Sequence, residues 1–219
     1  MEPWRTLIGI AIERLEGIGL DRTQWIWGGG TVLMLRYHHR LSRDVDIFIN
    51  DVQYLSYLSP RLNEAKTGNI LGYSEQANHL RLEYSQGEID FLTVAPVFPD
   101  ILPEEKQLEG IEGFIQLMPD KEILAQKLHY RAAGFTGRDL YDFAAVTLAD
   151  PALLGDVDLW KIAAQKRDAL EVSLQSIDCA LGYEHVREPT LLLPFAEARA
   201  ALIHWIDSSL AGHAARPAV

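Results

Sequence analysis

The 219-residue sequence contains one cysteine, Cys179, and no run of eighteen or more apolar residues. A lone cysteine excludes both a disulfide framework and a cysteine-based zinc site. Without a long apolar run there is no candidate for a membrane-spanning helix, and we expect no membrane association. The first nineteen residues carry three glutamates within an apolar pattern, which predicts an amphipathic helix rather than a secretion signal. We therefore expect a compact cytoplasmic protein.

Positively charged residues are outnumbered, because 20 lysines and arginines stand against 31 acidic residues and the formal net charge is -11. This balance argues against a broad surface for nucleic acid, which would need lysines and arginines. Residues 1–50 nevertheless hold six arginines against six acidic residues. A basic cluster lies there, formed by Arg36, His38, His39, Arg40 and Arg43. Any contact with a polyanion is therefore expected to be local.

The pattern up to about residue 98 mixes helices with strands. We predict a helix at 5–19, a strand at 25–27, a helix opening at Thr31 with its hydroxyl as cap, a strand at 44–49, and a hairpin of strands 79–84 and 88–94.

From about Asp120 the pattern becomes helical. Helices are expected at 120–133, 138–150, 156–181 and 194–210, and the proline-rich residues 95–119 are expected to connect the two halves. The predicted fold class is α+β, a small mixed sheet with flanking helices followed by a C-terminal helical bundle. We expect a core domain at 1–98 and a mainly helical domain at 99–219 that contributes to the active-site cleft.

Two carboxylates stand out at Asp44 and Asp46. Side chains alternate along a strand, so both aspartates point to one face while Val45 points into the core. A divalent cation offsets the repulsion between two such charges. Asp90, inside the apolar strand "EIDFLTV", is the candidate third carboxylate if the two strands are neighbours.

A glycine triplet, Gly28-Gly29-Gly30, precedes these carboxylates. A glycine turn entering a helix offers backbone N–H groups and a positive dipole end to an anion such as phosphate. The triplet matches neither the dinucleotide fingerprint, since Leu33 occupies the third glycine position, nor the P-loop, since no Gly-Lys-Ser/Thr follows. Carboxylates beside a phosphate site are parts of metal-dependent nucleotidyl transfer.

Simpler interpretations remain open. Asp-x-Asp occurs on strands by chance, and the glycines are also compatible with a tight turn alone. Arg36 and Arg43 are compatible with solvent-facing charges. His38 and His39 are compatible with ligands of a metal hydrolase, although no further ligand stands at metal spacing nearby.

The run from Gly28 to Thr31, followed by Leu33, Leu35, His39, Arg40, Ser42, Asp44 and Asp46, resembles the first motif of the AbiEii/AbiGii family of nucleotidyltransferase toxins. These toxins have the DNA polymerase β-like nucleotidyltransferase fold. The family's later pattern is matched by "KLHYR" (127–131) followed by "RDLYD" (138–142). The resemblance covers roughly residues 24–145, and nothing beyond residue 150 carries a motif.

Lys127 and Arg131 lie one helical turn apart beside the apolar stripe Ile123, Leu124 and Leu128. The resemblance implies that Lys127 contacts nucleotide phosphates and that Asp139 and Asp142 position Lys127 or Arg131. An internal salt-bridge network is the alternative for these two aspartates. The expected catalytic residues are Asp44, Asp46, Asp90 and Lys127. The expected nucleotide-binding residues are Gly28, Gly29, Gly30, Thr31, Arg40, Ser42, Arg43, Lys127 and Arg131.

We accordingly expect an enzyme that moves a nucleoside monophosphate from an NTP to a hydroxyl acceptor. The three aspartates would bind two Mg²⁺ or Mn²⁺ ions. The resemblance implies tRNA, another RNA or a protein as acceptor, and the toxin role in a type IV toxin–antitoxin system with a possible antitoxin protein. The alternatives are a small-molecule nucleotidyltransferase of the antibiotic-modifying kind, or a nucleotide- or metal-binding module without turnover.

Overall fold

The computed structural model describes residues 2–62, 69–177, 186–190 and 194–214, and side chains in the last helix only as far as Asp207. Cys179 lies outside the described residues, as does the end of the helical segment expected at 156–181. By their contacts the residues form two compact units. Unit 1 comprises residues 1–35 and 42–119, and unit 2 comprises residues 36–41 and 120–219.

Unit 1 is built on a seven-stranded mixed sheet with the order β3-β4-β5-β2-β1-β7-β6. Its strands are β1 (Trp25–Gly28), β2 (Val45–Ile49), β3 (Gly72–Gln76), β4 (His79–Tyr84), β5 (Gly87–Leu92), β6 (Glu104–Gln107) and β7 (Phe114–Leu117). Two pairs are parallel, β2 with β5 and β1 with β7, and the other pairs are antiparallel.

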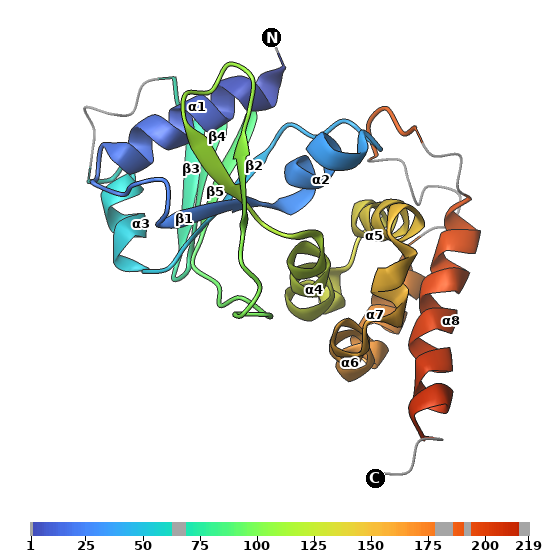
Figure 1. Cartoon of the computed structure of the whole chain (residues 1–219). Helices are drawn as coiled ribbons and strands as arrows, with labels where there is room; N and C mark the ends of the chain where they lie inside the picture. Colours follow the sequence, from blue (N-terminus) through green and yellow to red (C-terminus); the bar gives the residue numbers. More distant parts are fainter. Residues whose placement is uncertain (1, 63–68, 178–185, 191–193, 215–219) are drawn as a thin grey trace. The chain divides into compact units, whose positions relative to one another are not determined.

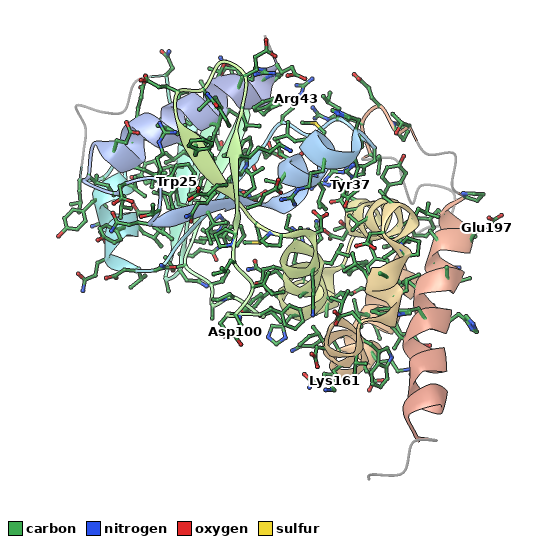
Figure 2. All side chains as sticks on the ribbon, viewed as in Figure 1. Trp25, Tyr37, Arg43, Asp100, Lys161 and Glu197 are labelled. Atoms are coloured by element: carbon green, nitrogen blue, oxygen red, sulfur yellow. The ribbon has the colours of Figure 1, made fainter. Side chains whose placement is uncertain are left out.

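Three helices accompany the sheet: α1 (Pro3–Glu16), α2 (Gly29–Tyr37) and α3 (Gln53–Leu58). Helix α1 packs across β5 and β2 (Figure 1). Its apolar residues Leu7, Ile8 and Leu15 are fully buried. Each such side chain stabilises the fold by roughly 1.5–3 kcal/mol. In Figure 2, Trp25 lies among the packed side chains of the sheet, whereas Arg43 lies at the periphery.

The mixed fold and the hairpin of β4 and β5 agree with the sequence prediction, but the expected connection at 95–119 contains strands β6 and β7. All four residues of β6 are exposed, and β7 is only four residues long. Neither strand therefore shows the extended alternation that would reveal it. The sheet continues beyond the boundary expected at residue 98, and the compact units divide after Pro119.

Unit 2 is helical. Its helices are α4 (Asp120–Tyr130), α5 (Gly137–Ala149), α6 (Val157–Gln165), α7 (Arg167–Ser176) and α8 (Phe195–Ala214). They pack against one another, with the Phe143 and Trp205 rings 5.4 Å apart between α5 and α8. The single helix expected from residue 156 is two helices, because Lys166 leaves helical geometry at ψ 9°. Within the described residues no helix is long and apolar enough to cross a bilayer.

Candidate active site

Two of the predicted carboxylates lie on neighbouring strands of unit 1. Asp46 on β2 and Asp90 on β5 are direct register partners in a parallel pair, so both side chains lie on the same face of the sheet. Val45 and Ile47 are fully buried on the opposite face. The alternation and the strand adjacency expected from the sequence are therefore present.

The glycine triplet forms the passage from β1 into α2. Gly28 pairs with Asp46 across β1 and β2, and Gly29 begins α2 with φ at 72°. A Cβ atom on residue 29 would overlap the Asp46 carboxylate. The carboxylate therefore lies against the backbone of the first helical turn, whose N–H groups have no partners within the helix itself. These amides are suited to bind an anion.

Thr31 plays a different part from the cap expected. The helix starts two residues earlier, and the buried Thr31 hydroxyl donates to the backbone oxygen of Asp44. The same oxygen atom of Thr31 lies 2.8 Å from the Ser42 hydroxyl. Thr31 and Ser42 thus join the start of α2 to the segment that carries Asp44.

Asp44 lies just before β2 and contacts the start of β5. Its Oδ1 accepts a hydrogen bond of 3.2 Å from the backbone N–H of Glu88. Glu88 was not predicted as part of the site. Burial raises the pKa of its carboxyl, Arg81 opposes that effect, and the charges of Asp44 and Asp90 raise it further. Glu88 therefore adds a carboxyl group next to Asp44 and Asp90.

Asp90 is held by two further residues that sequence reasoning missed. His79 Nε2 lies 2.7 Å from Asp90 Oδ1, and Arg81 donates to both carboxylate oxygens at 2.9 and 3.2 Å. Burial alone would raise the pKa of Asp90, but the hydrogen bonds from His79 and Arg81 hold it below its usual value. The alternation in "HLRLEY" was the available signal, because it places His79 and Arg81 on one face of β4.

The carboxylates fit a hard divalent cation by their chemistry. Within the described residues, no three His, Cys, Asp or Glu side chains are already grouped as ligands. Mg²⁺ usually needs only one or two carboxylates, because substrate phosphates and water supply the other oxygens. Asp44 and Asp46 are therefore the side chains able to hold such an ion together with a nucleotide.

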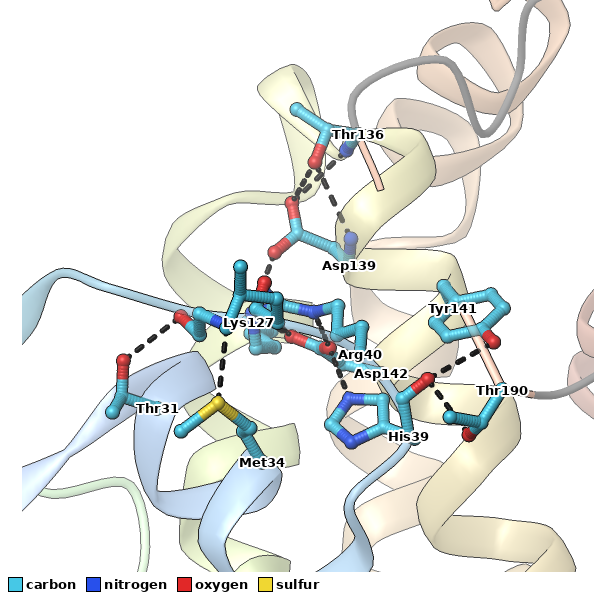
Figure 3. Close-up of polar contacts among 12 residues, drawn as sticks. Thr31, Met34, His39, Arg40, Lys127, Thr136, Asp139, Tyr141, Asp142 and Thr190 are labelled. Atoms are coloured by element: carbon cyan, nitrogen blue, oxygen red, sulfur yellow. Dashed lines mark hydrogen bonds and ion pairs between the residues drawn. The ribbon is translucent and has the colours of Figure 1, made fainter. Parts of the chain in front are cut away.

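A second group of predicted residues lies in unit 2, around Lys127 on α4. Lys127 Nζ is 2.7 Å from Asp139 and 3.1 Å from Asp142, and Arg131 lies 3.1 Å from Asp139. Asp139 also forms a capping box with Thr136 at the start of α5. Figure 3 shows Asp139 between Thr136 and Lys127.

These contacts shift the pKa values of the cluster. Burial opposes charge on both aspartates, yet Lys127 and the arginines lower the pKa of Asp139 and of Asp142. Burial also opposes charge on Lys127, but the two carboxylates raise its pKa. All three side chains are therefore charged near neutral pH.

Arg40 is predicted as a nucleotide ligand, and the structure gives it a protein partner. Its guanidinium makes bonds of 2.6 and 2.9 Å to the two oxygens of Asp142 and is almost fully buried. His39, which the sequence suggested as a hydrolase ligand at most, also binds Asp142, at 2.7 Å. Arg43 by contrast is exposed.

The mixed sheet carries carboxylates on a central strand against a glycine-entered helix, and the family comparison identifies the protein as a nucleotidyltransferase. The model of the family described as "Nucleotidyl transferase AbiEii toxin, Type IV TA system" matches residues 14–201. The chain belongs to this family, as the resemblance of its motifs predicted.

A solved structure shares the fold. MenT4, a nucleotidyltransferase toxin from Mycobacterium tuberculosis H37Rv, matches with a TM-score of 0.59 at 15% identity, over 92% of this chain and 82% of MenT4. The antibiotic-resistance factor ANT(2'')-Ia matches with a TM-score of 0.49 at 15% identity, over 84% of this chain and 98% of its own. No curated protein matches the chain.

Proposed function

We propose that this nucleotidyltransferase moves a nucleoside monophosphate from an NTP to a hydroxyl acceptor. The observation that carries the proposal is the Asp46 carboxylate packed against Gly29 at the start of α2, beside Asp90 on the neighbouring strand. A carboxylate able to hold a divalent cation and backbone amides able to bind phosphate are thereby adjacent. The acceptor oxygen attacks the α-phosphorus, the α–β phosphoanhydride bond breaks, and pyrophosphate leaves.

Asp44 and Asp46 would hold a pair of divalent cations, which we propose to be Mg²⁺ or Mn²⁺ ions. When bound, the ions would lower the pKa of the acceptor hydroxyl and offset phosphate charge. Asp90 would serve as the third carboxylate. A carboxylate has about four lone-pair sites, which exceeds the three bonds from His79 and Arg81. These bonds also keep Asp90 deprotonated.

The glycine turn, Arg43, Lys127 and Arg131 would bind the triphosphate. Residues 28–31 would supply backbone N–H groups, while Ser42 holds Thr31 in place and the exposed Arg43 contributes charge nearby. Lys127 and Arg131 would offset the negative charge of the leaving pyrophosphate. Their cluster, with Arg40 included, contains three cations and two carboxylates, Asp139 and Asp142. This excess of positive charge suits an anionic ligand.

For the acceptor we propose RNA, with a tRNA end as the first candidate, or a protein hydroxyl. The protein would act as the toxin of a type IV toxin–antitoxin pair, because the matching family carries that description. Its partner would be an antitoxin protein, and both would act in the cytoplasm.

The test is a transfer assay with α-labelled NTPs. The protein is incubated with Mg²⁺ and total RNA, purified proteins or aminoglycosides, and labelled acceptor and released pyrophosphate are measured. We expect transfer that a chelator abolishes. Asp46→Asn should reduce it by more than the roughly 100-fold that loss of a group supporting a metal ligand costs.

Asp168→Asn is the matched control, because Asp168 is 99% exposed on α7. It should retain the parent rate. Labelled aminoglycoside without labelled RNA or protein would identify a small-molecule enzyme instead. Mg²⁺-dependent NTP binding with no pyrophosphate release would favour a binding module. Parent-level transfer by Asp46→Asn would refute the assignment of the carboxylates.

A further inference from the structure

The end of α2 and the residues that follow it, 36–41, make their contacts within unit 2. Residues 36–41 group with the helices, although the chain on both sides belongs to the sheet unit. Within this segment His38 has a φ of 49°, which is uncommon for a residue other than glycine. His39 and Arg40 follow and are buried, although a histidine–arginine pair is polar and basic. A buried charged side chain needs a partner of opposite charge, so these two residues are expected to make a specific contact.

That contact is Asp142, which is fully buried in α5. Arg40 binds both of its oxygens, and His39 donates to Oδ1 from Nε2 at 2.7 Å (Figure 3). The His39 backbone oxygen is fixed in turn by Thr190, through N–H at 2.9 Å and hydroxyl at 3.0 Å, and by the Tyr141 hydroxyl at 3.2 Å. Hydrogen bonds therefore fix both the backbone of this segment and its two buried side chains.

Asp142 is also a partner of Lys127. The Nζ atom lies 3.1 Å from Asp142 Oδ2 and 2.7 Å from Asp139 Oδ1, so two carboxylates set its place. The Arg40 fork shares Oδ2 with Lys127, because Nη2 binds that oxygen at 2.9 Å. Removal of Arg40 would leave Lys127 as the main charge partner of a buried carboxylate, and Lys127 would be drawn closer to it.

We infer that His39 and Arg40 are positioning residues that act on Lys127 through Asp142, instead of binding the nucleotide themselves. This inference rests on the proposed function, in which Lys127 binds the triphosphate. Arg40 suits the role because its planar fork matches the two oxygens of a carboxylate, which a lysine ammonium cannot reproduce. His39 completes the support at Oδ1.

A double-mutant cycle tests the route of action. Arg40→Lys, Lys127→Met and the double variant are compared for affinity toward a non-hydrolysable NTP and for kcat and KM. Arg40→Lys alone should weaken NTP affinity by about 10- to 100-fold, the range for loss of a supporting partner. In the Lys127→Met background the same change should have less than about a twofold further effect, because the residue it acts through is absent. Additive effects would overturn the inference.

Two variants of His39 provide a test by rescue. His39→Gln keeps a donor where Nε2 stood, whereas His39→Leu removes it. Affinity lost in His39→Leu should largely return in His39→Gln, and equal losses in both would contradict the proposed role. Arg167→Lys is the matched control, because Arg167 pairs with Asp207 at 2.9 Å on the surface of the same unit. It should behave as the parent protein.

A readout without nucleotide separates this inference from the proposed function. Competitive acetylation followed by mass spectrometry gives the reactivity of Lys127, with exposed Lys161 as internal reference. Arg40→Lys should change the Lys127 rate by about tenfold and leave the Lys161 rate unchanged. An unchanged Lys127 rate in a folded variant overturns the positioning role. A changed rate in a protein that binds no NTP supports it and refutes only the proposed function.

Discussion

The carboxylate of Asp46 occupies the space that a side chain on residue 29 would need. Gly29 is thus required twice, once for its φ of 72° and once for the close approach of Asp46. Because residue 29 has no Cβ atom, the Asp46 carboxylate, which is the proposed cation-binding group, can lie directly against the start of α2.

Gly29→Ala should therefore reduce the transfer rate strongly and lower the free energy of unfolding only modestly. Left-handed geometry at a non-glycine residue costs about 1–2 kcal/mol, and the added methyl group must displace Asp46. A misplacement of about 1 Å near the chemistry reduces the rate by roughly 100-fold. Urea unfolding and the transfer assay measure the two effects. Gly19→Ala is the matched control, because φ there is 84° and nothing lies within 4 Å of an added Cβ atom. It should lose similar stability and keep activity, and equal activity of the two variants would contradict the prediction.

Arg81→Met should raise the pKa of Asp90. The variant loses the two hydrogen bonds that lower this pKa, while the burial that raises it remains. Unfolding free energy at pH 7 should fall by about 1 kcal/mol, near the lower end for an unsatisfied group because Arg81 is partly exposed. Carbon-13 NMR of labelled aspartate carboxyls reports the titration. Arg61→Met, which removes an exposed pairing with Glu75 at 3.3 Å, should leave Asp90 unaffected. An unshifted Asp90 in Arg81→Met would show that His79 alone controls it.

Asp142→Asn should destabilise the protein in a pH-dependent way. At pH 5 to 7 the loss should be about 3–5 kcal/mol, as for a broken buried ion pair, because Arg40 and Lys127 lose their charged partner. The folded pKa of Asp142 is depressed, so its stabilisation is present above the unfolded value of about 3.9 and declines as pH falls toward the folded value. The difference between variant and parent should therefore shrink below about pH 4.

Denaturant unfolding between pH 3 and pH 7 provides the measurement. The control Asp168→Asn alters a 99% exposed carboxylate and should show no such dependence. A constant difference across the whole range would mean that Asp142 titrates equally in the folded and unfolded states.

The sequence was sufficient for features that depend on short-range periodicity. Alternation along the strands placed Asp46 opposite the buried Val45 and Ile47, and Asp90 opposite the buried Ile89 and Phe91. Both follow from the period of two in a strand. The motif that carries Gly28 and Asp46 indicated the family that the comparison shows.

Other features depend on partners far along the chain, which one sequence does not reveal. Arg40 is buried because it pairs with Asp142, which lies 102 residues further along the chain. Nothing in "HHRLS" distinguishes this arginine from a phosphate ligand. Strand β6 has no apolar residue and exists because β7 pairs with it. The end of α6 at Lys166 carries neither glycine nor proline, so no local signal marked it.

The grouping of residues 36–41 with the helices means that the chain passes between the two units three times, after residues 35, 41 and 119. A single cut after residue 119 therefore cannot yield two self-sufficient fragments. The first would carry away His39 and Arg40, and the second would keep Asp142 buried without its guanidinium partner. Fragments 1–119 and 120–219 produced together should accordingly reassemble through this loop, which makes the protein a natural candidate for split-enzyme complementation.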